Sequence, residues 1–162
     1  MHYIKVLFAL AVALPVMNAL AQGTSPYGLS INLENAKKAS AAAVAEARKN
    51  SWTMAIAIVD PSGTLVYFEK MDNTQLGSVK VALDKARSAA LFKRSTKIFQ
   101  DRLTSGNAGL PALAVEGATP LEGGIPLVMD GHIVGAIGVS GDSSEHDGQC
   151  AQAGTDSLKD QN

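Results

Sequence analysis

The sequence predicts a single α+β domain in which helices pack against one mainly antiparallel sheet. Two segments, 33–49 and 79–90, repeat small apolar residues at helical spacing. Two further regions, 53–69 and 125–139, each contain two β-favouring runs joined by a short turn. Strands joined by tight turns pair antiparallel, so the order helix, hairpin, helices, loop, hairpin, helix predicts this class.

The composition narrows the function classes. The 162 residues include 14 basic and 15 acidic side chains, which give a formal net charge of -1, and only 5% are aromatic. Near-neutral charge provides little attraction to nucleic acid or to an acidic membrane surface. The few aromatic residues are too sparse for a base-stacking platform. We therefore expect no nucleic-acid partner.

Residues 1–21 have the pattern of an export signal. A basic Lys5 precedes the apolar run Val6–Met17, and Ala19-Leu20-Ala21 forms an A-x-A cleavage site. The run is shorter than the roughly 20 residues of a spanning helix. We expect a periplasmic or secreted protein without stable membrane insertion after cleavage, with a tether at 22–31 and one domain at 32–158.

The first half of the domain predicts a helix, a hairpin and a second helix. Asn32 is a suitable N-cap for a helix Leu33–Lys49. The runs Thr53–Val59 and Thr64–Glu69 flank an Asp-Pro-Ser-Gly turn. The next helix has a narrow apolar stripe, with Lys80, Asp84 and Arg87 on one flank and Lys85 alone on the other.

The second half is less regular at first. A short helix is expected near 95–103, and glycine and proline interrupt 104–120. The strands Ile125–Met129 and Ile133–Val139 then flank Asp130-Gly131, which is a tight-turn pair. Ser144-x-x-Asp147 resembles a capping box that opens a last helix through about Leu158.

Few residues have the spacing of known catalytic or metal sites. The sequence has no G-x-S-x-G elbow and no C-x-x-C or H-E-x-x-H motif. His132 and His146 are weak candidates for metal ligands, and His146 shares a helix face with Cys150 if that helix forms. Cys150 is the sole cysteine, so it is either a buried small hydrophobe or a free thiol that could pair between subunits.

Several segments in the right order resemble one family. These segments are the hairpin Ala57–Val66, the pair Lys70–Asp72 and Asp84–Arg87, the segments Gly123–Leu127 and Asp130–Gly141, and the final Asp147–Gly154. Together they resemble motifs of the GlcG/HbpS family of haem-binding and haem-degrading-like proteins. The resemblance implies a five-stranded, mainly antiparallel sheet flanked by helices, a profilin- or PAS-like fold similar to the PduO C-terminal domain. It also implies homo-oligomers, from dimer to octamer, and haem, corrinoid or iron as ligands.

Glycines within the last predicted strand suggest where a ligand could sit. Gly135 and Gly138 would leave room over the sheet. The remaining predicted lining consists of Met71, Asp72, Lys85, Gly123 and Gly124. Lys85 could meet a carboxylate or propionate; alternatively, Asp72 caps the following helix and Lys85 is merely exposed.

Three functional hypotheses follow. The first is an exported binder of haem or a related tetrapyrrole. The second is an enzyme that acts on a small organic acid or degrades haem, with Asp72 and Lys85 as an acid/base and anchor pair. The third is an oligomeric accessory protein without catalysis.

Overall fold

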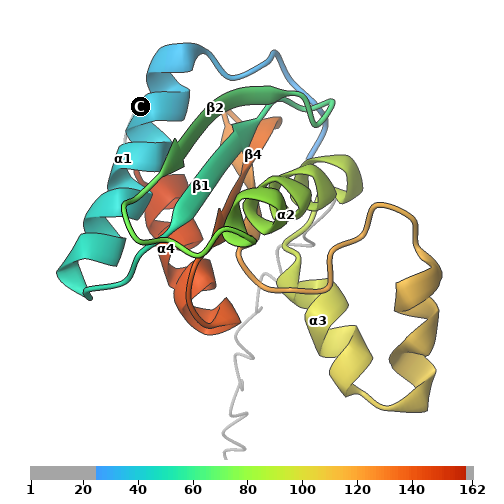
Figure 1. Cartoon of the computed structure of the whole chain (residues 1–162). Coiled ribbons are helices and arrows are strands. Elements are labelled where there is room, and N and C mark those ends of the chain that lie inside the picture. Colours follow the sequence, from blue (N-terminus) through green and yellow to red (C-terminus); the bar gives the residue numbers. More distant parts are fainter. Residues whose placement is uncertain (1–24, 160–162) are drawn as a thin grey trace, which may run out of the picture.

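The protein is built in three layers (Figure 1). The computed structural model describes residues 25–159, so the predicted export signal lies outside the described part. Helix α2 (Ser78–Phe92) covers one face of the sheet, and α1 (Leu33–Lys49) and α4 (Ser144–Asp156) cover the other. Within residues 25–159, no helix is long and apolar enough to cross a membrane.

Within the described residues the sheet has four strands in the order β2-β1-β4-β3, and each neighbouring pair is antiparallel. Its strands are β1 (Ala55–Val59), β2 (Leu65–Lys70), β3 (Gly124–Met129) and β4 (His132–Ser140). The mainly antiparallel α+β architecture is confirmed, whereas the expectation of five strands is wrong. Edge strand β3 carries Pro126, which lacks an amide donor.

The tether takes the place beside β4 that a further strand would occupy. β1 pairs with only the 136–140 part of β4. Next to the first residues of β4, Ile133 donates to Pro26 and accepts from Gly28, and Ile31 donates to Val134. In the described part of the tether, residues 25–31, only Tyr27 forms a bridge, with Ile133, because the chain then turns away into α1. The Tyr27 hydroxyl donates to the carbonyl oxygens of Ala90 and Leu91, which ties the tether to the end of α2.

Helix α1 begins and ends as its sequence predicts. Asn32 Oδ1 accepts a hydrogen bond from the Asn35 amide at 2.8 Å, and Asn50 ends the helix. The buried face consists of small residues, which allows close packing against α4 and the sheet. Its buried residues are Ala36, Ala39, Ser40, Ala43, Val44 and Ala47.

Helix α2 lies so close to the sheet that glycine is required beneath it. A Cβ at Gly138 would overlap the carbonyl oxygen of Ala82 and the amide nitrogen of Ala86. At Gly135, a Cβ would overlap the carbonyl oxygen of Val59 and come within 3.2 Å of Ile31 Cγ2. The room that we expected over these glycines is therefore filled by backbone and by the tether.

The irregular segment forms an arm beside the body (Figure 1). It contains α3 (Lys97–Thr104) and the 3₁₀ helix η1 (Asn107–Ala114), which pack on each other. Phe99 anchors the base of the arm through an edge contact with Phe92. Three apolar side chains of the arm, Leu110, Leu113 and Val115, remain exposed.

Helix α4 begins with a different cap from the one predicted. Ser143 is the N-cap, and its Oγ accepts from the His146 amide at 3.3 Å. The capping box that starts at Ser144 is wrong, because the Asp147 carboxylate turns into the protein interior. Cys150 is buried, in agreement with the predicted alternative of a small hydrophobic residue in the core. Burial raises the pKa of its thiol to about 12.

We predict that Gly138→Ala lowers the free energy of unfolding by about 1–3 kcal/mol or more, because the new methyl group forces α2 away from the sheet. Urea denaturation measures this loss. Gly77→Ala at the start of α2 is the matched control, since a Cβ there meets no atom within 4 Å. Equal stabilities of the two variants would contradict the close packing.

Candidate functional site

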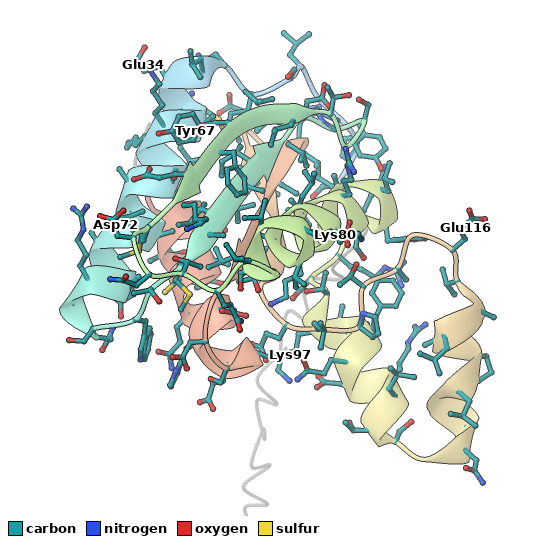
Figure 2. The ribbon with its side chains drawn as sticks, in the orientation of Figure 1. Glu34, Tyr67, Asp72, Lys80, Lys97 and Glu116 are labelled. Carbon is teal, nitrogen blue, oxygen red and sulfur yellow. The ribbon has the colours of Figure 1, made fainter. Side chains whose placement is uncertain are left out.

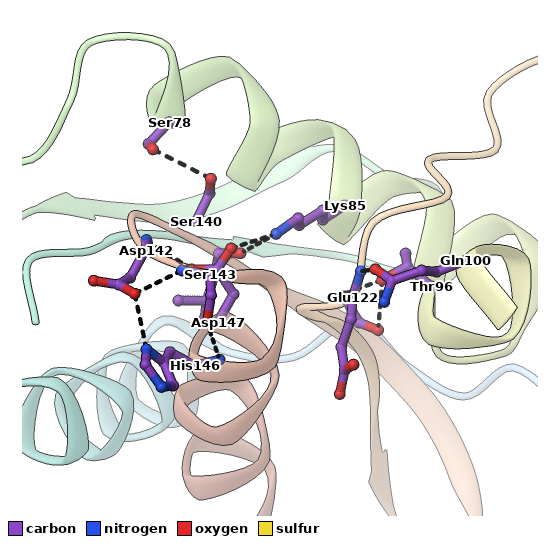
Figure 3. A network of polar contacts seen from close by, with 12 residues as sticks. Ser78, Lys85, Thr96, Gln100, Glu122, Ser140, Asp142, Ser143, His146 and Asp147 are labelled. Carbon is purple, nitrogen blue, oxygen red and sulfur yellow. Dashed lines mark hydrogen bonds and ion pairs between the residues drawn. The ribbon is translucent and has the colours of Figure 1, made fainter. Parts of the chain in front are cut away.

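A buried ion pair joins α2 to α4 (Figure 3). Lys85 Nζ lies 2.6 Å from Asp147 Oδ2 and donates to the carbonyl oxygen of Val139 at 3.0 Å. The two side chains are only 1% and 4% exposed. Asp147 Oδ1 also accepts from the Asp142 amide at 3.2 Å. The pair therefore connects α2, the end of β4 and the first turn of α4.

The protonation equilibria of this pair reflect its removal from water. Burial lowers the pKa of Lys85, and the opposing attraction of Asp147 is smaller. Burial likewise raises the pKa of Asp147 against the attraction of Lys85. Both charges are costly in this interior, so each depends on the other to remain ionised.

The turn before β3 closes over the ion pair. A Cβ at Gly123 would lie 3.0 Å from Lys85 Nζ and 2.9 Å from Asp147 Cβ. Gly124 packs on the backbone of Lys85, and its amide donates to Thr96 Oγ1 at 2.9 Å. Next to this turn, burial raises the pKa of the Glu122 carboxyl. The glycines thus seal the pair from solvent.

Only some of the predicted ligand-site residues lie close together in the structure. Lys85, Gly123, Gly124 and Gly138 gather around the contact between α2 and the sheet. Met71 and Asp72 lie in the loop after β2, where the Asp72 side chain is exposed (Asp72 is labelled in Figure 2). Within residues 25–159, Asp72 forms no ion pair or side-chain hydrogen bond. Lys85 is buried, not exposed on a helix flank, and its ammonium group is held by Asp147.

A separate open cleft lies where the tether crosses the β3–β4 hairpin. It encloses about 420 Å³, and we call it the hairpin cleft. Its lining residues are Gly28, Leu29, Ser30, Ile31, Asn32, Asn35, Met129, Asp130, His132 and Val134. A Cβ at Gly28 would approach His132 Cβ to 2.8 Å, so the glycine lets the tether pass close to this histidine.

The tautomer of His132 follows from the hydrogen bond of its Nδ1. Its Nδ1 lies 2.8 Å from the carbonyl oxygen of Asp130, which can only accept. Nδ1 therefore carries the proton, and in the neutral ring Nε2 has a free lone pair. A backbone carbonyl that fixes the other nitrogen is a common arrangement for a metal-ligating histidine.

Comparison with known proteins places the chain in a family. Residues 31–156 match the family model "Haem degrading protein HbpS-like". The chain belongs to the HbpS-like family.

Individual relatives agree with this assignment. Protein GlcG of Escherichia coli (strain K12) is 39% identical over 100 residues, which are 62% of this chain and 73% of that protein. The crystal structure of HbpS superposes with a TM-score of 0.73 at 31% identity and covers 84% of this chain and 95% of that one. The crystal structure of a PduOC:heme complex gives 0.72 at 28% identity and covers 81% and 96%.

The second candidate metal ligand of this HbpS-like chain lies away from the hairpin cleft. The His146 ring stacks on Trp52 with 3.9 Å between the ring centroids, and its Nδ1 lies 2.8 Å from Asp142 Oδ1. Across residues 25–159, no group of three or more His, Cys, Asp or Glu side chains is arranged to hold a metal ion. Metal binding by His132 or His146 therefore stays a prediction.

Sequence reasoning missed most of the hairpin cleft. It singled out His132 but not the tether or Asn35, because their approach to the hairpin depends on long-range contacts. One signal was present: the turn Asp130-Gly131 makes Met129 and His132 neighbours across a hairpin. The partner of Lys85 was also missed, because Asp147 was assigned to a helix cap.

We predict that Lys85→Met lowers the free energy of unfolding by about 3–5 kcal/mol, because it leaves the buried Asp147 carboxylate unpaired. Chemical denaturation provides the measurement. Lys80→Met removes the exposed pair with Asp84 and should change stability by less than about 1 kcal/mol. In the double variant Lys85→Met/Asp147→Leu, much of the loss should be recovered, and a purely additive loss would argue against this account.

Proposed function

We propose that this protein binds haem or a closely related tetrapyrrole in the hairpin cleft and serves in haem handling. The observation that carries the proposal is the His132 side chain, whose Nδ1 is held by the Asp130 carbonyl while Nε2 retains its lone pair. Membership of the HbpS-like family and the fold shared with the PduOC:heme complex support the same ligand class.

The residues of the cleft fit such a group. Haem requires an apolar slot and an axial ligand. Leu29, Ile31 and Val134 supply apolar walls, and the volume falls within the roughly 300–1,000 Å³ typical of small-molecule sites. Bound haem would provide the iron that His132 ligates. The Asp130 carbonyl would hold the imidazole in the correct tautomer, and the first turn of α1 would offer partial positive charge to a carboxylate.

The structure gives less support to the enzymatic alternative. An acid/base and anchor pair needs two accessible groups that face one ligand. Asp72 is exposed in a loop, whereas Lys85 is buried against Asp147. A corrinoid remains the main competing tetrapyrrole, because an imidazole nitrogen suits cobalt as well as iron.

We predict that the purified protein binds haemin saturably at micromolar concentration, seen as a shift of the Soret band. His132→Ala should weaken binding by about 10-fold or more, because the iron loses its protein ligand. The same titration with cobalamin tests the corrinoid alternative.

His146→Ala is the matched control for this experiment. It removes an imidazole that stacks on Trp52 outside the hairpin cleft, so haemin affinity should be unchanged. If haemin causes no Soret shift with the unaltered protein, the haem proposal is refuted. An equal loss in both histidine variants would refute the assignment to the hairpin cleft.

We further propose that residues 1–21 direct export and are removed, so that the protein works in the periplasm or outside the cell. The support is the basic, apolar and A-x-A pattern of the segment. N-terminal sequencing of the exported protein should begin at Gln22. Protein that retains Met1 and remains in the cytoplasm would show the proposal to be wrong.

We also propose that the chain forms homo-oligomers. The exposed leucines of the arm, Leu110 and Leu113, are the kind of surface that association covers. Native mass measurement tests this, and a strict monomer at all concentrations would contradict it.

A further inference from the structure

Two side chains with soft or borderline ligand atoms lie side by side in the hairpin cleft. Met129 and His132 are direct partners in the register of β3 and β4. Direct cross-strand partners have Cβ atoms roughly 4.5–5.5 Å apart on the same face of the sheet. Both residues line the same cleft. A thioether and an imidazole therefore face one space from the two strands of one hairpin.

Each of the two side chains is already oriented by a neighbour. Asn35 Nδ2 of α1 donates to Met129 Sδ at 3.8 Å, and Asp130 holds His132 Nδ1. A thioether sulfur has two lone pairs, so one remains free when Asn35 occupies the other. The neutral His132 ring likewise keeps the lone pair of Nε2. Two ligand atoms are thus held in place and each retains one electron pair.

We propose that Met129 Sδ and His132 Nε2 form a binding site for Cu(I), which goes beyond tetrapyrrole binding. Thioether sulfur selects soft ions such as Cu(I), and imidazole is also a good copper ligand. Hard cations such as Mg²⁺ and Ca²⁺ prefer several oxygen ligands, whereas the cleft lining within residues 25–159 offers a single carboxylate, that of Asp130. Cu(I) accepts low coordination numbers, so two protein ligands suit it.

The test is a competition between the haem-free protein and a chromophoric Cu(I) chelator, under anaerobic conditions with ascorbate. The unaltered protein should withdraw one Cu(I) per chain from the chelator. Met129→Leu and His132→Ala should each weaken this binding by about 10-fold or more. Leucine replaces methionine at nearly constant volume, so loss of folding does not explain the result.

Met71→Leu is the matched control, because it removes a partly buried thioether outside the hairpin cleft. Its Cu(I) affinity should equal that of the unaltered protein. All variants share the same residues 1–21, retained or removed, so any contribution from Met1, His2 and Met17 is the same throughout. If Met129→Leu or His132→Ala competes as well as the unaltered protein, or if all three variants lose affinity equally, the copper site is refuted.

The haemin titration separates this inference from the proposed function. Met129→Leu keeps His132 and replaces one cleft side chain by another of nearly equal volume, so it should lower haemin affinity less than His132→Ala does, while it weakens Cu(I) binding by about 10-fold or more. If the protein binds Cu(I) through both residues but haemin never shifts the Soret band, the copper site is supported and the haem proposal is refuted. If the protein binds haemin through His132 but Met129→Leu leaves its Cu(I) affinity unchanged, the haem proposal is supported and the copper site is refuted.

Discussion

The structure depends on the close contact between α2 and the sheet, which the Lys85–Asp147 ion pair completes. Taking two charges out of water is costly, and the cost is offset only when the partners meet with good geometry. Here the ammonium group reaches a carboxylate and a carbonyl oxygen at 2.6 and 3.0 Å. Because the two residues lie on different helices, the pair is formed only when both helices and β4 are in place.

The hairpin cleft forms because β1 pairs with only part of β4. β1 is shorter than β4, so the first residues of β4 are free to accept the tether. The tether then supplies a wall of the cleft, and α1, which follows it, supplies another. The cleft is therefore formed by two regions that are distant in sequence, the tether with the first turn of α1 and the β3–β4 hairpin.

Local patterns were sufficient for most of the secondary structure. The helix Leu33–Lys49 has an N-cap, a regular small-residue face and a clear end, and all of these are local signals. The hairpins were equally visible from their turns. Lys85 shows where this approach fails: on a helix pattern a lysine indicates a solvated flank, and only the position of α4 reveals its partner. The prediction for Asp147 was wrong for the same reason, since a carboxylate in the first turn of a helix is compatible with a helix cap as well as with a buried ion pair. The expected fifth strand came from family resemblance, and the tether replaces it with three backbone hydrogen bonds.

Pro126 in the edge strand β3 has a consequence for how copies of this protein can associate. An edge strand with a full set of amide groups is a template on which another chain can extend the sheet. The missing amide hydrogen of Pro126 interrupts such a row, so continuous strand addition along β3 is disfavoured. Contacts between copies on the β3 side of the sheet would then use side chains and not a continuous backbone ladder, which protects the molecule from uncontrolled polymerisation through this edge.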